Sequence, residues 1–291
     1  MFTDELGFRV PDEESTNWGA AAFKARLALY ILDPVVDPRP GSALAGDDES
    51  YQWEKCSAWA RASLIAAIDH LVLWANVVAP QKLFDGMIVS NPPRPYYTLA
   101  RAALESAAQS LWVLKPEDSS ERVHRHLRLL YHDLRQLALA LEQRGNGAET
   151  EVRGRMEQTK ARVGNAYPIE SITRGEPKYL AMIRECAPLI KMDSAQLEIL
   201  WRGASAAAHG KNWFQYVGYT MTIGEEYEPG YFRAAFAPDP AAITETATAA
   251  ADLTLYAVLR YITRAGFNPE PLQQAAMAKL MAETPLNPER A

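Results

Sequence analysis

Three side chains suited to phosphate chemistry, Arg202, Ser205 and His209, fall within one short stretch of the chain. At about 100° per residue, Ser205 lies about 60° and His209 about 20° from Arg202 around a helix, so the three share a face. Arginine presents a permanent fork of donors to an anionic oxygen, and histidine exchanges a proton near neutral pH. The spacing predicts His209 as general acid–base, Arg202 as the phosphate-stabilising group and Ser205 as a positioning group.

The residues next to these three in the sequence have small side chains. Alanine stands at positions 204, 206, 207 and 208, so we expect an open ledge on which a ligand or a partner backbone approaches closely. A purely structural interpretation of the same residues is also open. His209 and Ser205 lie at the end of the helix, where a cation suits the helix dipole and a polar side chain caps free carbonyls.

An Arg, six residues and a His near the end of a helix in an all-α protein resembles the motif of the HEPN superfamily (higher eukaryotes and prokaryotes nucleotide-binding). The ending Ser205-x3-His209-Gly210 is also similar to that of helical bacterial proteins of unassigned function. The resemblance covers mainly residues 96–265. It implies that Arg202 and His209 of two protomers meet in a homodimer, where they bind RNA or a nucleotide or cleave RNA without metal or cofactor.

A second candidate site is a basic strip on the helix that follows Asp118. Its members lie within about 80° of arc, opposite a stripe of leucines. We expect the strip to bind phosphate or the RNA backbone. The alternatives are a solvated face, or ion pairs with the acidic N-terminal arm. The residues assigned to phosphate binding are Arg122, Arg125, Arg128 and His132.

Two pairs of charged residues interrupt apolar helices. Asp69-His70 stands in the most apolar stretch, and Arg101 and Glu105 stand one turn apart among alanines. A charge inside a bundle is costly unless it is paired. These four residues are therefore expected either to form a structural network, with or without Arg202, or to orient His209 from behind.

No metal site is predicted. Glu121-x2-His124 matches half of a di-iron pattern, but a second Glu-x2-His is missing from the sequence. Two cysteines, Cys56 and Cys186, are too few for a zinc site or a disulfide framework, and we expect buried thiols. Gly-rich phosphate loops and nucleophile elbows are also missing, so a small-molecule enzyme with a pocket among the helices stays open without support from a motif.

Composition places the chain among globular proteins. Of 291 residues, 48% are apolar and 23% charged, and the net charge is −6. Residues 1–54 carry −7 of this charge, so the neutral remainder offers no broad field for a nucleic-acid duplex. We expect the apolar stretch Ala62–Ala79 to be a core helix rather than a membrane span. The N-terminus shows no secretory pattern, so the expected compartment is the cytoplasm.

Helical periodicity dominates the chain. It predicts helices at about 18–32, 51–79, 96–114, 118–144, 148–163, 177–188, 194–209, 240–264 and 270–283, with a hairpin at about 216–236. The fold class is therefore all-α, a helical bundle with a small β-hairpin before the last long helix. Residues 1–50 are expected to form an acidic N-terminal extension with a short helix, and residues 51–291 a single domain.

Two functions follow. The first is a HEPN-like protein that binds RNA or a nucleotide, or acts as a metal-independent endoribonuclease. The second is a non-catalytic binding or scaffold module, the partner or immunity component of a bacterial defence or toxin–antitoxin system. The second requires the Arg202–His209 face to be covered by the hairpin and paired within one molecule.

Overall fold

The computed structural model describes residues 10–81, 93–163 and 166–283. The protein is an all-α helical bundle with a two-stranded hairpin before its last long helix. Its helices are α1 (Asp12–Leu32), α2 (Ala43–Ser50), α3 (Cys56–Val78), α4 (Pro93–Leu114), α5 (Ser119–Glu142), α6 (Glu149–Val163), α7 (Ile169–Thr173), α8 (Tyr179–Cys186), α9 (Ser194–Ala208), α10 (Gln215–Gly218), α11 (Pro240–Arg264) and α12 (Pro269–Glu283). The strands are β1 (Tyr219–Glu228) and β2 (Tyr231–Pro238).

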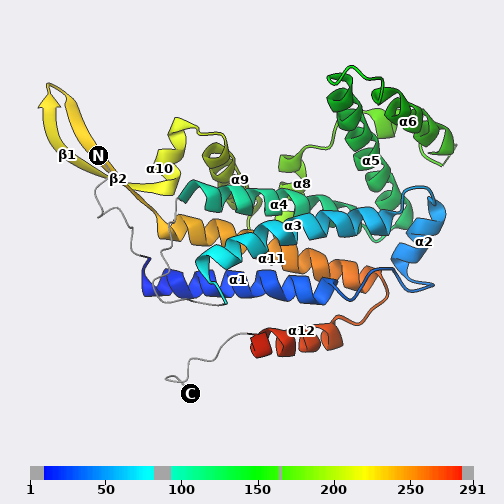
Figure 1. Ribbon diagram of the computed structural model, residues 1–291, viewed down its shortest axis with the longest axis horizontal. Coiled ribbons are helices and arrows are strands. Elements are labelled where there is room, and N and C mark those ends of the chain that lie inside the picture. Colours follow the sequence, from blue (N-terminus) through cyan, green and yellow to red (C-terminus); the bar gives the residue numbers. More distant parts are fainter. Residues whose placement is uncertain (1–9, 82–92, 164–165, 284–291) are drawn as a thin grey trace.

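Four long helices form the body of the molecule. Helices α1 and α4 each pack against both α3 and α11, so the four close into a ring around a shared core (Figure 1). Trp74 and Tyr261 fill this core with leucines and alanines. Each helix has one apolar stripe, and the ring covers all four stripes.

The N-terminal region is part of this body and not an extension of it. Helix α1 begins at Asp12, six residues before the predicted start, and buries Ala22, Ala25, Ala28 and Ile31. Residues 33–50, whose prolines, glycines and acidic run predict a solvated connector, contain α2, and its Leu44 is also buried. Asp47 and Asp48 of α2 are buried as well, so the acidic residues of this region do not mark a solvated segment.

Aspartate side chains cap the first turns of α5 and α9. The Asp118 carboxylate accepts a hydrogen bond from the Glu121 amide at 2.8 Å, and α5 begins at Ser119, directly after Asp118. Asp193 caps α9 in the same way. These side chains satisfy amides that the first turn leaves free, and they fix where α5 and α9 begin.

Helices α5, α6 and α7 enclose a second, smaller core at one end of the bundle (Figure 1). Val123, Leu127 and Leu134 of α5 contact Val152 and Met156 of α6 there. The leucine stripe on α5 therefore serves this local core, and the opposite face of α5 lies toward α4 and α8.

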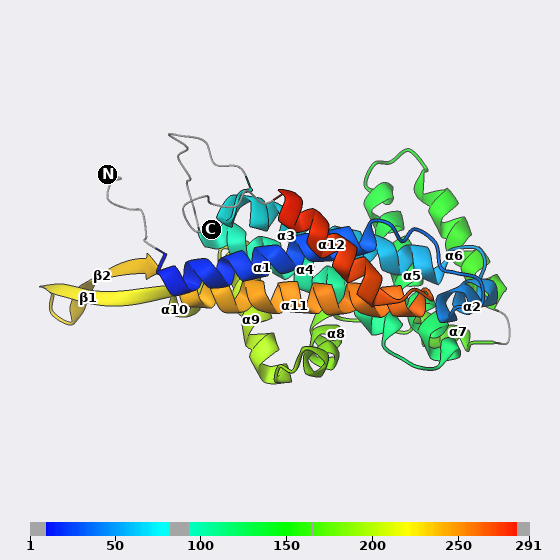
Figure 2. The same ribbon diagram turned by 90° about the horizontal axis from the view of Figure 1, so that it is seen from below.

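The hairpin projects from the other end of the bundle, beyond α10 (Figure 2). Its strands pair antiparallel from Tyr219–Pro238 to Glu228–Tyr231, with irregular register beyond Ile223. Nearly every residue of both strands is exposed. The hairpin covers neither α9 nor any other described helix face.

Among the described residues, α3 is the one helix that is long and apolar enough to cross a membrane. Its residues Leu64, Leu71 and Trp74 lie in the core of the ring, against α1 and α4. Its most apolar window is 33% buried inside the bundle, so the core accounts for part of its apolarity.

Candidate functional site

The motif helix α9 packs on α4 through its small residues. Ala204, Ala206 and Ala207 are buried, and a Cβ at Gly203 would stand 3.5 Å from the Val217 side chain. The expected open ledge is therefore wrong. The alanines bring helix backbones close together, and no bare surface is left above most of them.

The polar residues of the motif remain at the surface beside this contact. Arg202 and His209 are exposed, and Ser205 is half-buried. His209 follows the last residue of α9, and its amide donates to the Ser205 carbonyl at 3.0 Å. Gly210 then takes a left-handed conformation with φ of +64°, which ends the helix as predicted.

His209 contacts Arg101 of α4. Arg101 Nη1 lies 3.3 Å from His209 Nε2. Because arginine has no acceptor, Nε2 must accept this hydrogen bond, and the ring proton is then on Nδ1. The structure thus joins the motif histidine to one of the residues expected to support it.

Glu105 holds the arginine in place. Its Oε1 accepts from Arg101 Nε at 2.9 Å and from Trp201 Nε1 at 2.8 Å. The carboxylate links α4 to α9 and fixes one edge of the guanidinium, while the other edge faces His209. We call His209, Arg101, Glu105 and Trp201 the α4–α9 cluster.

Arg202 is not part of this cluster. Its Nε donates to Glu198 Oε1 at 2.6 Å, one turn back along α9, and Arg184 pairs with the same carboxylate. The guanidinium is therefore drawn away from His209, two turns distant at about 1.5 Å rise per residue. Within one molecule, Arg101 takes the place beside His209 that the motif predicted for Arg202.

Asp69 and His70 do not join the network either. Asp69 is exposed and His70 half-buried on α3, and neither side chain contacts Arg101, Glu105 or His209 in the described structure. The sequence suggested burial because their neighbours are apolar. At this point, however, α3 turns one face to solvent, which removes the need for pairing.

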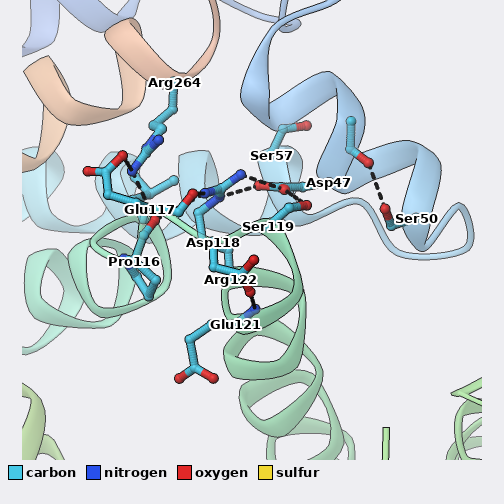
Figure 3. Close-up of polar contacts among 12 residues, drawn as sticks. Asp47, Ser50, Ser57, Pro116, Glu117, Asp118, Ser119, Glu121, Arg122 and Arg264 are labelled. Carbon is cyan, nitrogen blue, oxygen red and sulfur yellow. Dashed lines mark hydrogen bonds and ion pairs between the residues drawn. The ribbon is translucent and has the colours of Figure 1, made fainter. Parts of the chain in front are cut away.

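The predicted basic strip on α5 is not an open phosphate-binding surface. Arg122 is 2% exposed. Its Nε and Nη2 donate to the Asp47 carboxylate at 2.6 and 2.8 Å, and Nη1 donates to the Pro116 and Glu117 carbonyls (Figure 3). Asp47 belongs to the acidic N-terminal region, so the alternative of ion pairing with that region is correct for Arg122.

The remaining strip residues are also engaged or buried. Arg125 pairs with Glu121 and Glu185 and lies over the Trp112 ring. Arg128 contacts the same ring. His132 is 2% exposed, and neither ring nitrogen has a hydrogen-bond partner among the described residues. Helix α8 and the 176–177 segment cover this face, which no local sequence pattern reveals.

Sequence reasoning missed Arg94. Its Nη1 donates to the Ala207 carbonyl at 3.3 Å, and its guanidinium lies 5.0 Å from the Phe214 ring centre. It therefore adds positive charge at the end of α9, near the exposed Lys211. Prolines at positions 92, 93 and 95 around it are typical of a loop and draw attention away from a site.

A metal site finds no support in the described ranges, where no three His, Cys, Asp or Glu residues gather in a way that suits an ion. Cys56 and Cys186 are free and buried, as expected, and burial raises the pKa of both thiols. The chemistry available at the α4–α9 cluster is therefore that of a guanidinium, an imidazole and a carboxylate.

Comparisons with protein-family models, curated proteins and solved structures found no match to this chain.

Proposed function

We propose that the α4–α9 cluster binds a phosphate of single-stranded RNA and cleaves the chain there without a metal ion. The observation that carries the proposal is the exposed pair of Arg101 Nη1 and His209 Nε2, 3.3 Å apart. An anionic phosphate oxygen replaces this contact favourably, since it accepts from Arg101 and approaches the imidazole at the same time. The HEPN-like spacing of Arg202 and His209 points to the same substrate class.

Each residue has a defined task in this reaction. His209 accepts the proton of the ribose 2′-hydroxyl through Nε2, and the hydroxyl oxygen attacks phosphorus. Arg101 stabilises the extra charge on the phosphate oxygens. The bond to the 5′ oxygen breaks, that oxygen takes a proton from water, and a 2′,3′-cyclic phosphate remains. Glu105 positions Arg101, and Ser205 positions the His209 backbone.

Purified protein incubated with end-labelled single-stranded RNA tests the proposal, with chelator present throughout. We expect cleavage to a cyclic phosphate by wild type, and a loss of at least about a hundredfold in His209→Ala, the usual effect of removing a general base. Arg153→Ala is the matched control because it removes an exposed arginine on α6. Equal RNA turnover by wild type and His209→Ala contradicts the catalytic proposal.

The hairpin favours a second role, self-association. Alternation along the strands places Met221, Ile223, Phe232 and Phe236 on one face of the hairpin, and all four are exposed. An isolated two-stranded hairpin is marginally stable, and an apolar face of this kind is expected to be covered. We propose that a second copy of the chain covers this face in a cytoplasmic homodimer. The HEPN-like resemblance also implies a homodimer, but one in which Arg202 and His209 of the two protomers meet.

The non-catalytic scaffold considered above, the partner or immunity component, meets one of its two structural requirements. Arg202 and His209 both have partners within one molecule, but the hairpin does not cover them. The RNA experiment decides between these functions, because a scaffold shows no difference between wild type and His209→Ala.

A further inference from the structure

A small cavity of about 270 Å³ lies where the main bundle meets the second core. Helices α3, α4, α5 and α8 all contribute to its walls. Its polar lining consists of Gln109, His132, Asp133, Gln136, Glu176 and Tyr179, and its apolar lining includes Trp59, Leu129 and Met182. Ligand sites are typically concave, largely apolar and placed between packing units.

The buried histidine of this cavity lacks partners. His132 is 2% exposed, and both ring nitrogens are buried without a hydrogen bond in the described structure. Burying a polar group without a hydrogen bond destabilises the folded protein. A ligand that donates to the unprotonated ring nitrogen removes part of this cost, so the ring is an independent indication that the cavity is built for an occupant.

Two exposed carboxylates in the cavity lining, those of Asp133 and Glu176, have no cation partner among the described residues. Asp133 has no ion pair or hydrogen bond in the described residues, and Glu176 accepts only from the neutral amide of Gln136, at 3.1 Å. The cavity walls and then the Glu176 charge raise the pKa of Asp133. Arg128 and Arg135 affect His132 from outside the lining, and they do not pair with either carboxylate.

Tyr179 completes the acceptor-rich lining. Gln109 Nε2 donates to its hydroxyl at 3.4 Å. Burial and then the carboxylates of Glu105, Glu176 and Asp133 raise its pKa, so the phenol stays protonated. Asp133 and Glu176 attract a positive charge, while Trp59 and Tyr179 offer aromatic faces to a cation and its apolar substituent.

We propose that this cavity binds a small organic ammonium compound. Asp133 and Glu176 accept hydrogen bonds from its ammonium group, His132 accepts a further one, and the apolar walls hold its carbon skeleton. Small aromatic amines suit the cavity in size and charge. The site is separate from the RNA proposal, because none of its lining residues belongs to the α4–α9 cluster.

Isothermal titration calorimetry with benzylamine and 2-phenylethylamine tests the proposal, with benzyl alcohol and 2-phenylethanol as neutral counterparts of the same shape. We expect at least one amine to bind at millimolar concentration or below, and each alcohol to bind at least about tenfold more weakly. If neither amine binds at millimolar concentration, or if the alcohols bind as well as the amines, the assignment is overturned.

Variants locate the binding. Asp133→Asn and Glu176→Gln should each weaken amine binding about tenfold. Glu170→Gln on α7 is the matched control, since it removes the same charge from an exposed residue that does not line the cavity, and it should bind as wild type does. Unchanged affinity in both cavity variants contradicts the site.

His132→Leu separates ligand binding from folding. Replacing an unpaired buried imidazole by an apolar side chain of similar size should leave the thermal midpoint of the ligand-free protein unchanged or higher, while amine affinity falls severalfold. A midpoint well below that of wild type would show that the imidazole is bonded within the protein, and it would remove the argument for a ligand.

Discussion

The buried ion pair between Arg122 and Asp47 shows how one contact can replace an expected function. Both side chains are almost fully buried, at 3% and 0% exposure. The Arg122 guanidinium, at the start of α5, donates hydrogen bonds to the Asp47 carboxylate of α2 and to the Pro116 carbonyl in the loop between α4 and α5. It therefore ties these three segments together (Figure 3). An arginine with these partners is a structural residue and is not available to a phosphate.

We expect Arg122→Met to lower the free energy of unfolding by about 3–5 kcal/mol, because it leaves the Asp47 carboxylate buried without a counter-ion. Arg153→Met removes one partner of an exposed pair with Glu142 and should cost about 1 kcal/mol or less. Urea denaturation of the two variants measures both values. A loss of similar size in both would contradict the structural role of Arg122.

His126 should make the protein sensitive to acid. The ring is fully buried, Nε2 donates to the Glu54 carbonyl at 2.8 Å, and burial lowers the pKa of the imidazole from 6.5. The unfolded chain then binds more protons than the folded one below that value. The corresponding stability is present above pH 6.5 and is lost as the pH falls toward the lowered pKa.

Urea denaturation between about pH 5 and 8 measures this dependence, with a maximal slope near 1.4 kcal/mol per pH unit for one histidine. His126→Gln keeps a donor for Glu54 and should flatten the slope. His132 contributes in the same direction, so His126→Gln with His132→Leu should flatten it further. An unchanged slope in the double variant would show that other groups cause the acid sensitivity.

At the scale of the elements, the end of α11 packs closely against the segment before α2. Gly266 has φ of +84°, and a Cβ there would lie 2.8 Å from Ser42 Cβ and 3.3 Å from Arg39 Cβ. Arg39 also donates its amide to the Ala265 carbonyl at 2.9 Å. The glycine thus ends the helix and lets the segment before α2 pack against it.

Gly266→Ala should therefore destabilise the protein by about 2–4 kcal/mol, the sum of backbone strain and steric overlap. Gly210→Ala is the control for strain alone, because φ is +64° but no atom lies within 4 Å of the added Cβ, and it should cost about 1–2 kcal/mol. Thermal unfolding of both variants compares them. Equal losses would mean that the contact with Ser42 is unimportant.

For the whole molecule, the exposed hairpin is the feature that a single chain leaves incomplete. If a second copy covers its apolar face, Ile223→Lys with Phe232→Lys should convert a dimer into a monomer, because charged side chains cannot be buried unpaired at such an interface. Thr220→Lys with Thr222→Lys places the same charges on the other face and should leave the dimer intact. Sedimentation analysis measures the mass, and a monomeric wild type would refute the dimer.

Local sequence signals located most helices. The caps at Asp118 and Asp193, the glycines at 210 and 266, and the leucine stripe of α5 act within a few residues, so they can be read without knowledge of the rest of the chain. The hairpin was also predicted, although it begins three residues and ends two residues after the expected 216–236.

The sequence by itself determined the all-α class, the ends of many helices and the surface position of Arg202 and His209, because propensity, capping and periodicity are properties of neighbouring residues. Only the tertiary structure decided that Arg101 stands beside His209, that Asp47 neutralises Arg122 and that His132 faces a cavity. The partners in each case come from helices separated by 75 or more residues or from the covering α8 segment. Such pairings follow from how helices pack, which no local pattern specifies.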